Sequence, residues 1–433
     1  MYDNMALWKI GEESLLSERR SVMLFGKRKK RPIAAESEKS AESGDTVRTA
    51  ETEEENDGAG EYDPWRDITH DKAVRILFFP FCLAVLMILL SLVSRSFAEA
   101  YCRTFGSLTR KILAAITGIL PFSLAETLFF AGFVLLLYGI VRCIAEAIKK
   151  VPYDKRFERR FNRAIIAAVL FCFTFYGLNF APCNRRTTLA DNLGIEREAV
   201  SAKQLYNASV FVAGELSDCL EKGDIRYGSS GLSSLPYSFD ELSDRVNEAY
   251  DKVYDRYPFL TRMHAPVKRV ALSEWMTYTH ISGIYIPYTG EANINIHYPD
   301  YVIAFSTAHE MAHQRGISHE DEANFVAFLV LYQSDDYYLR YSALCELYNY
   351  LTDALYSADE ELFYSALYKT PRGVLREMMG FSDFFEPYSN STASKVADTV
   401  NSASIKLRGD SEGTKSYDMM VDLAVAYFGI GEE

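Results

Sequence analysis

The sequence predicts an α-helical transmembrane region joined to a mostly α-helical (α+β) domain with a small β-sheet. Two observations predict this class. Three apolar stretches of near-membrane length lie between residues 76 and 180, and the polar segment after residue 184 contains a His-Glu-x-x-His motif preceded by short β-prone runs. With 433 residues the chain is several times longer than an average domain of roughly 150 residues, so it has room for both parts.

Residues 1–70 are predicted to form a largely disordered cytoplasmic tail. Between Pro32 and Pro64 the tail is rich in Glu, Ser, Ala and Thr. Such a composition cannot bury enough apolar surface to offset the entropy lost on ordering. The residues before it are polar and basic, with no apolar run typical of a cleavable signal peptide.

Residues 71–183 are predicted to contain three transmembrane helices, at about 76–94, 122–141 and 164–180. Each stretch approaches the ~20 residues that cross the apolar core of a bilayer. A fourth apolar run, 112–120, is too short to span and is expected on the outer surface. Basic residues cluster at 19–31 and in the loop 142–163, which places both segments in the cytoplasm. Three crossings then leave residues 184–433 outside the cell membrane.

The extracytoplasmic domain is predicted to be mostly helical. Helices are expected at about 202–221, 239–257, 337–356 and 418–428, and short strands at 270–272 and 284–286. Gly290 marks a turn, and Ile294 and Ile296 alternate with polar neighbours as in a further strand. The small sheet therefore comes directly before the helix that carries the His-Glu-x-x-His motif.

His309 and His313 are four residues apart, so on a helix they lie on one face and can hold one zinc ion. Glu310 lies beside them, where it can act as the catalytic base of a hydrolase. The alternative is a surface helix with an incidental pair of histidines. The apolar residues that precede the motif favour a buried helix and hence the metal site.

The third metal ligand has two candidates, Glu320 and His319. Ser318 resembles an N-cap, and a long apolar helix is expected from about 320 to 332. Glu320, Ala323 and Asn324 share one face of that helix, so the small alanine brings the Glu320 carboxylate close to the zinc. Asn324 is expected to support a ligating histidine. His319 is otherwise expected in the helix cap, pointing to solvent.

His319 competes because residues 309–319 match the elongated metzincin signature, which has three histidine ligands, letter for letter. That signature is accompanied by a methionine turn, and the sequence offers no convincing candidate for one. The sequence therefore favours Glu320 and leaves His319 as the alternative.

The motif region resembles an uncharacterised family of bacterial multi-pass membrane proteins. The resemblance is carried by residues 277–280 (TYTH), 283–295 (GIYIPYTGEANIN), 307–316 (TAHEMAHQRG) and 320–325 (EDEANF), and weakly by 177–179 (GLN). The same core is similar to gluzincin-type membrane zinc metallopeptidases, whose third ligand is a glutamate in an E-x-x-A-D segment. The resemblance implies a zincin-like fold with Glu320 as ligand. His280 departs from the pattern, which implies a small residue there.

These features predict a membrane-anchored zinc metallopeptidase that acts on a peptide or protein at the outer face of the membrane. An edge strand within 283–296 could hold the peptide, or the hairpin could merely pack the motif helix. Tyr285, His297 and Tyr332 are candidate donors to an oxyanion, and the sequence does not select among them. The alternative function is a membrane sensor or scaffold whose zincin-like domain binds a partner without appreciable catalysis.

The composition excludes other classes. A net charge of −13 argues against nucleic-acid binding, which needs a basic face. The seven cysteines include no C-x-x-C pair, so a thiolate zinc site is excluded. Cys183, Cys219 and Cys345 are expected outside the cytoplasm, where two of them could pair, but free thiols are favoured. The oligomeric state leaves no mark in the sequence.

Overall fold

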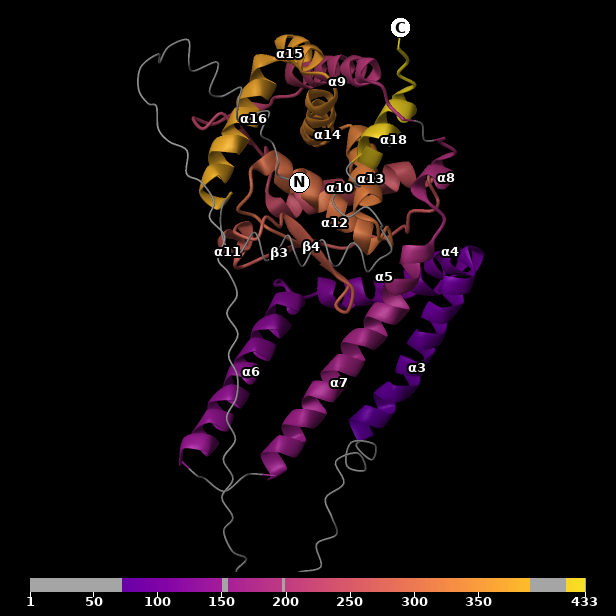
Figure 1. The fold of residues 1–433 in the computed structure, drawn as a ribbon, viewed down its shortest axis with the longest axis vertical. Coiled ribbons are helices and arrows are strands. Elements are labelled where there is room, and N and C mark those ends of the chain that lie inside the picture. The colour runs from indigo at the N-terminus through magenta and orange to yellow at the C-terminus, as the bar shows by residue number, and fades with distance from the viewer. Residues whose placement is uncertain (1–71, 150–154, 197–198, 390–417, 433) are drawn as a thin grey trace, which may run out of the picture.

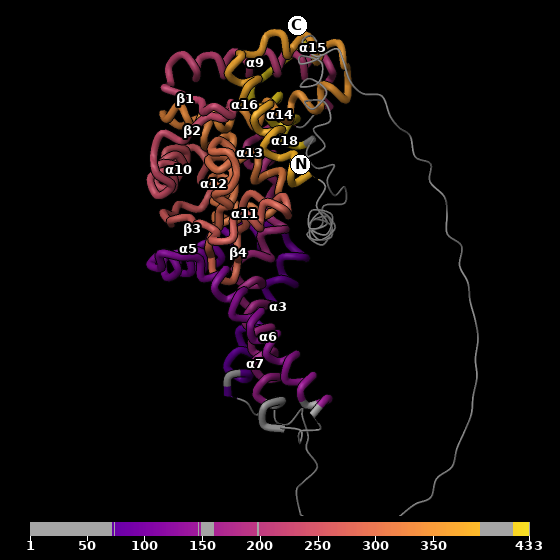
Figure 2. Tube along the Cα trace, turned by 90° about the vertical axis from the view of Figure 1, so that its left-hand side faces the viewer, coloured from indigo at the N-terminus to yellow at the C-terminus, as the bar shows by residue number. Residues whose placement is uncertain are grey.

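A computed structural model describes residues 72–149, 155–196, 199–389 and 418–432. Three long helices form one end of the molecule, and a helical domain forms the other (Figure 1). The view turned by 90° shows the same two-part arrangement (Figure 2). The predicted cytoplasmic tail, residues 1–70, lies outside the described residues. The predicted boundary at residue 184 stays a prediction.

The long helices are α3 (Lys72–Val93), α6 (Leu124–Lys149) and α7 (Lys155–Asn179). Each contains a segment long and apolar enough to cross a membrane: Val74–Val93, Leu124–Ala145 and Arg160–Asn179. Large apolar side chains along these helices are exposed, as a lipid environment requires. The three apolar helices are confirmed, each within a few residues of its predicted range.

Two shorter helices lie between α3 and α6 in the chain. They are α4 (Arg95–Arg103) and α5 (Phe105–Gly118), and both lie where the long helices meet the domain (Figure 1). After α7 the chain enters the domain through the 3-10 helix η1 (Ala181–Arg185) and the short helix α8 (Leu189–Leu193). The apolar run predicted for the outer surface falls largely in α5.

The small sheet before the motif helix has three strands in the order β3-β5-β4. Strand β4 (Gly283–Ile286) pairs antiparallel with β5 (Glu291–Ile294), which pairs parallel with β3 (Lys268–Arg269). Gly290 closes the β4–β5 turn with φ of 71°. Strand β4 therefore lies at one edge of this sheet. A separate two-stranded ladder joins β1 (Arg226–Tyr227) and β2 (Ser233–Ser234).

The strand predicted at residues 270–272 is wrong. Strand β3 ends at Arg269, and helix α11 (Ser273–Thr277) follows almost at once. The backbone N–H groups of Ala271 and Leu272 bind the two carboxylate oxygens of Glu126 instead of a neighbouring strand. A contact with α6 has therefore overridden the β-propensity of this apolar run.

The core is a set of packed helices around α13 (Glu320–Tyr332), in which every residue from Asp321 to Leu331 is buried. Its neighbours are α12 (Asp300–Gln314), α14 (Tyr337–Ala358), α10 (Phe239–Tyr254) and α18 (Asp418–Phe428). The surrounding helices are α9 (Ala202–Lys222), α15 (Glu360–Tyr368), α16 (Arg372–Phe385) and η2 (Glu386–Tyr388). The mostly helical fold with small sheets is confirmed.

The sheet is also tied to the start of α6. The carboxylate of Glu291 in β5 accepts hydrogen bonds from the backbone nitrogens of Leu124 and Ala125, at 3.0 and 2.8 Å. These are N–H groups that a helix leaves unsatisfied at its first turn, and a negative charge there is favourable. An apolar helix and the sheet beside the motif helix are thus held together by a buried carboxylate.

Candidate metal centre

Helix α12 positions the two histidines of the motif. Its residues are almost all buried, because it lies between the sheet and the core helices. His309 and His313 follow each other by one helical turn, with ring centroids 4.7 Å apart and ring planes at 87°. Both side chains therefore point to the same side of α12, as their spacing predicts.

A tight corner after α12 brings in the third side chain. Gly316 adopts φ of 91° just beyond the helix, a conformation that favours glycine. Helix α13 then begins at Glu320, with His319 rather than Ser318 as its N-cap. The prediction of Ser318 as N-cap is wrong, since this side chain is buried. The corner turns the first residue of α13 back toward the histidines.

The three side chains converge on one point. Nε2 of His309 and Nε2 of His313 each lie 3.2 Å from the same carboxylate oxygen of Glu320. All candidate ligand atoms of the trio lie within 4.8 Å of one another, and no other such group occurs in the part of the chain that the structure describes. Ligands at about 2.0–2.1 Å from a tetrahedral zinc lie about 3.3 Å apart, which the two N···O distances of 3.2 Å match.

The hydrogen bonding of His313 supports a cation at this point. Its Nδ1 lies 2.7 Å from the carbonyl oxygen of Ile317, which can only accept, so Nδ1 carries a proton. In the neutral ring, Nε2 then presents a lone pair toward the carboxylate of Glu320. Two lone pairs at 3.2 Å repel unless a proton or metal ion lies between them. The Ile317 carbonyl orients the ring as ligating histidines require.

Electrostatics agree with an ionised Glu320. Burial alone raises the pKa of this carboxyl group. Without a metal ion, protonated histidines would outweigh burial through the positive charge of His313 and hydrogen bonds from both rings, and a bound cation would act in the same direction. The pKa is held well below its ordinary value of 4.5. The group is therefore a carboxylate and able to coordinate a metal ion.

Two predicted neighbours lie elsewhere. Nε2 of His319 lies 3.3 Å from the carbonyl oxygen of Asn184, so its side chain contacts η1 instead of pointing to solvent. Asn324 donates to the hydroxyl of Tyr350 at 3.1 Å. The role expected of Asn324, support of a ligating histidine, belongs to the Ile317 carbonyl oxygen. His319 is absent from the group of converging ligand atoms.

Glu310 is buried on α12 and lies against the edge strand. A Cβ atom added to Gly283 of β4 would come within 2.6 Å of Glu310 Cγ and 2.8 Å of its Oε1. Only glycine therefore allows β4 to approach this carboxyl group so closely. The sequence placed Glu310 beside the histidines, but the contact with β4 joins residues distant in the chain and was not predicted.

The residues after His313 fix the end of α12 to its surroundings. Gln314 donates to the carbonyl oxygen of Gly290 in the β4–β5 turn at 2.8 Å. Arg315 donates to Asn247 and stacks 3.8 Å from the ring centroid of Tyr250 in α10. Burial lowers the pKa of this guanidinium to about 10 and outweighs the opposite effect of Tyr250. Gln314 and Arg315 of the QRG sequence thus hold the end of the helix that carries both histidines of the candidate metal centre.

The metal centre also touches the end of α7. Phe180 directly follows this apolar helix, and its ring lies 6.2 Å from that of His313 and 5.5 Å from that of Tyr285, between centroids. Asn179, the last residue of α7, donates to the backbone oxygen of Pro287. The weak resemblance at residues 177–179 was the only sequence signal for this contact.

The candidate oxyanion donors are engaged in other contacts. The Tyr332 hydroxyl donates to Glu215 at 2.9 Å, and Nε2 of His297 lies 2.9 Å from the Tyr388 hydroxyl. The buried Tyr285 hydroxyl accepts a hydrogen bond from Asn179 at 3.3 Å. No oxyanion donor is assigned.

Comparison with known proteins places the chain in a family. Residues 101–425 match the family described as "Protein of unknown function (DUF3810)". The chain belongs to this family. The match runs from α4 into α18, so the DUF3810 region includes the metal centre together with α5, α6 and α7. No curated protein and no solved structure matches the chain.

Membership of an uncharacterised family is therefore confirmed. His280 departs from the small residue that the resemblance implied, and it adopts φ of 59°, a conformation that favours glycine. Its Nε2 lies 3.0 Å from the carbonyl oxygen of Tyr388. The description of the DUF3810 family names no activity, so the chemistry of the protein must be argued from its site.

Proposed function

We propose that the protein is a membrane-anchored, gluzincin-like zinc metallopeptidase. The observation that carries the proposal is the convergence of His309, His313 and Glu320 beside Glu310. Two histidines and one glutamate form the ligand set of known catalytic zinc sites in peptidases, which leave one position open for reaction. A structural zinc site in a protein usually closes with a fourth ligand.

Zinc in such a site supplies Lewis-acid chemistry, polarising a carbonyl group and making a water molecule more acidic. Glu310 then acts as general base, taking a proton from that water and passing it to the leaving amine. Its burial against β4 limits the positions that its carboxylate can adopt. His313 is held in one orientation by the Ile317 carbonyl, so its ring need not be ordered when substrate binds.

Strand β4 is the element proposed to bind the substrate. It lies at the edge of its sheet, so an extended peptide could pair with the backbone groups on its outer side. Its first residue, Gly283, also lies directly against Glu310. A peptide on this edge would therefore pass beside the proposed base. In the alternative, the hairpin only packs α12.

Gly283→Ala is expected to lower peptide hydrolysis by about 10- to 100-fold with zinc content unchanged. The added methyl group would displace the Glu310 carboxylate, and small misplacements of a reacting group have effects of about this size. Gly214→Ala in α9 is the matched control, since a Cβ atom added there meets no atom within 4 Å. Steady-state kinetics and zinc analysis of both variants give the answer. Equal activity of Gly283→Ala and the parent protein would contradict the role of this contact.

The proposed location is the cell membrane, with three crossings and the metal centre on the outer side. Helix α5 supports this arrangement. It buries Ser107, Arg110, Ala114 and Thr117, and an opposite stripe of apolar side chains is exposed: Phe105, Leu108, Ile112 and Ile116. Such a helix lies in the plane of the membrane surface, with its apolar side in lipid. The metal centre would then lie close above the bilayer.

The topology is tested by a fusion. A reporter enzyme that is active only in the cytoplasm is expected to be silent when attached after Glu433, because the basic clusters of the tail and the loop 142–163 favour a cytoplasmic location. The same reporter attached before Met1 is the positive control. A strong signal from the C-terminal fusion would overturn the three-crossing arrangement.

The proposed activity is tested on the full-length chain purified in detergent. One zinc ion per chain is expected by elemental analysis after metal-free protein is reloaded, together with cleavage of a peptide library. The same preparation of Glu310→Gln controls for contaminating peptidases. Bound zinc without cleavage of any peptide would favour the sensor or scaffold instead. Absence of stoichiometric zinc would overturn the metallopeptidase.

A further inference from the structure

Two buried cysteines, Cys102 and Cys183, lie side by side below the domain. Cys102 is in α4 and Cys183 is in η1, so they are 81 residues apart in the chain. Their sulfur atoms are 2.9 Å apart, and both side chains are almost fully buried. Both residues lie outside the three apolar segments. The sequence favoured a free thiol at Cys183 and did not indicate Cys102 as a partner.

The surroundings of the pair favour a thiolate at Cys183. Nη1 of Arg110 lies 3.4 Å from its sulfur. Burial raises the pKa of Cys183, but the hydrogen bond with Cys102 and the charges of Arg110 and Arg186 outweigh burial and lower it to about 6. The pKa of Cys102 is raised well above 9.0, mainly by burial. Cys183 is thus the more readily ionised thiol of the pair. Because both thiols are buried in the folded domain, exchange with an oxidant takes place before η1 packs against α4 or when it opens.

We propose that Cys102 and Cys183 form a disulfide bond that joins α4 to η1. The sulfur atoms must approach by less than about 1 Å to reach the bond length of about 2.05 Å. The oxidant is a disulfide compound, such as a thiol-disulfide oxidoreductase or oxidised glutathione. Under the proposed topology the pair lies on the outer side of the membrane, where disulfides persist.

The exchange has two steps. The Cys183 thiolate attacks one sulfur of the oxidant, forming a mixed disulfide and releasing the other sulfur as a thiolate. Cys102 loses its proton and attacks the sulfur of Cys183, which forms the internal bond and releases the second thiolate of the oxidant. The chain loses two electrons and two protons, and the oxidant gains them as two thiols.

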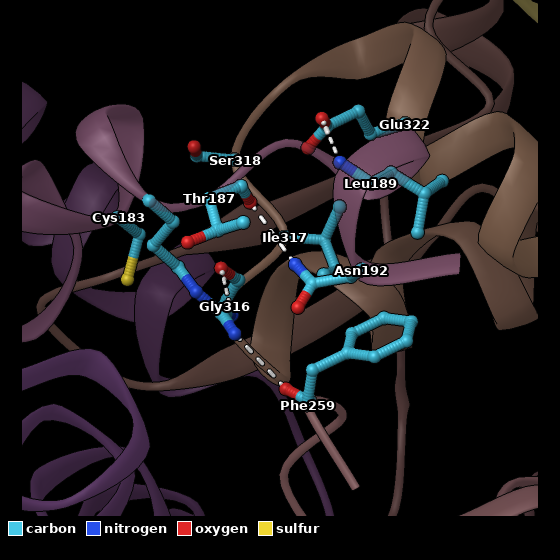
Figure 3. A pocket seen from close by; sticks show the side chains of 10 residues that line it. Cys183, Thr187, Leu189, Asn192, Phe259, Gly316, Ile317, Ser318 and Glu322 are labelled. Carbon is cyan, nitrogen blue, oxygen red and sulfur yellow. Dashed lines mark hydrogen bonds between the residues drawn. The ribbon is translucent and has the colours of Figure 1, made fainter. Parts of the chain in front are cut away.

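The disulfide would reinforce the support of the metal centre. Arg186 follows η1 and donates to the carbonyl oxygens of Gly316 and Phe259, each at 3.0 Å. Gly316 lies at the corner between the two helices that supply the metal ligands. Gly316 and Phe259 line a small pocket together with Cys183 (Figure 3), and Arg186 is another residue of its lining. Joining η1 to α4 therefore restrains the segment that holds this corner.

Arg110 keeps other hydrogen-bond partners after the disulfide forms. It donates to the backbone oxygens of Asn179 and Cys102, each at 2.9 Å, and lies 3.4 Å from the Thr261 hydroxyl. Its guanidinium group therefore keeps three oxygen partners when the Cys183 thiolate is consumed. The disulfide and the buried arginine are compatible.

The pair is tested on the full-length chain by differential labelling. Membranes are dissolved in a denaturant that contains a maleimide, so that buried free thiols also react. The protein is then reduced and treated with an isotopically heavy maleimide. A second sample is reduced, incubated with oxidised glutathione and labelled in the same way. Mass spectrometry should find the heavy label at Cys102 and Cys183 only. The other five of the seven cysteines should react before reduction and carry the light label.

Variants establish the partner. In Cys102→Ser, Cys183 is expected in the light-label set; in Cys172→Ser, an exposed cysteine of α7, the pair should be unchanged. Light label at Cys102 and Cys183 in both samples of the parent protein would overturn the proposal. So would a cross-linked peptide that joins either residue to another cysteine. Each of these outcomes is read from the parent chain, whether or not a variant folds.

Discussion

Glu310→Gln is expected to keep zinc bound while peptide hydrolysis falls by about 10²- to 10⁴-fold, the usual contribution of a general base. The amide has nearly the same shape as the carboxyl group, so its packing against Gly283 is retained. It cannot accept a proton from water. Because Glu310 is not among the converging ligand atoms, the affinity for zinc should not change.

The measurement is kcat/KM for a library-derived peptide, with zinc quantified in the same samples. Glu346→Gln in α14 is a matched control, because Glu346 is also a buried glutamate of the core helices and lies outside the candidate centre. Burial raises the pKa of Glu346 to about 7. The neutral amide of glutamine therefore resembles the protonated carboxyl group, a form that Glu346 readily adopts. Undiminished hydrolysis by Glu310→Gln would exclude this residue as the base.

Local sequence pattern was sufficient where a helix carries its own signals. The helix after the motif has the bounds predicted for it, 320–332, because a long apolar run follows a polar corner. The helix at 418–428 and the start of the one at 202 agree for the same reason. The apolar helices α3, α6 and α7 follow from hydropathy alone. The pairing of the two histidines follows from the period of the helix.

Long-range contacts were not predictable from local pattern. Phe180 against His313, Gly283 against Glu310 and Arg186 against Gly316 each join segments far apart in the chain. Helices α15 and α16 were also missed. A single sequence indicates which residues have the chemistry for a site, but not which distant residues hold them in position. For the same reason it does not indicate that Cys102 and Cys183 lie side by side.

The match of residues 309–319 to the three-histidine signature illustrates this limit. Spacing alone allows His319 to be the third ligand. The position of the third ligand depends on where α13 begins, and the structure begins it at Glu320 with His319 as N-cap. The first helical residue faces the histidines, while the capping residue faces the backbone of Asn184.

Glu320→Ala is accordingly expected to weaken zinc binding by at least ~10-fold, because a direct ligand is lost. Changes in residues that only support a ligand already lower metal affinity by roughly 10- to 100-fold. His319→Ala is expected to leave the affinity nearly unchanged, since its contact is with the Asn184 carbonyl oxygen. The double variant His309→Ala/His313→Ala gives the reference for complete loss of the site.

Competitive zinc titration of the three variants and the parent protein, side by side in detergent, separates the two ligand sets. The His2Glu set predicts that Glu320→Ala moves toward the double variant while His319→Ala stays with the parent. The three-histidine set predicts the reverse order. Because both residues lie at the start of α13, a general disturbance of that helix would affect the two variants alike. Loss of zinc from His319→Ala with retention by Glu320→Ala would therefore refute the gluzincin-like assignment.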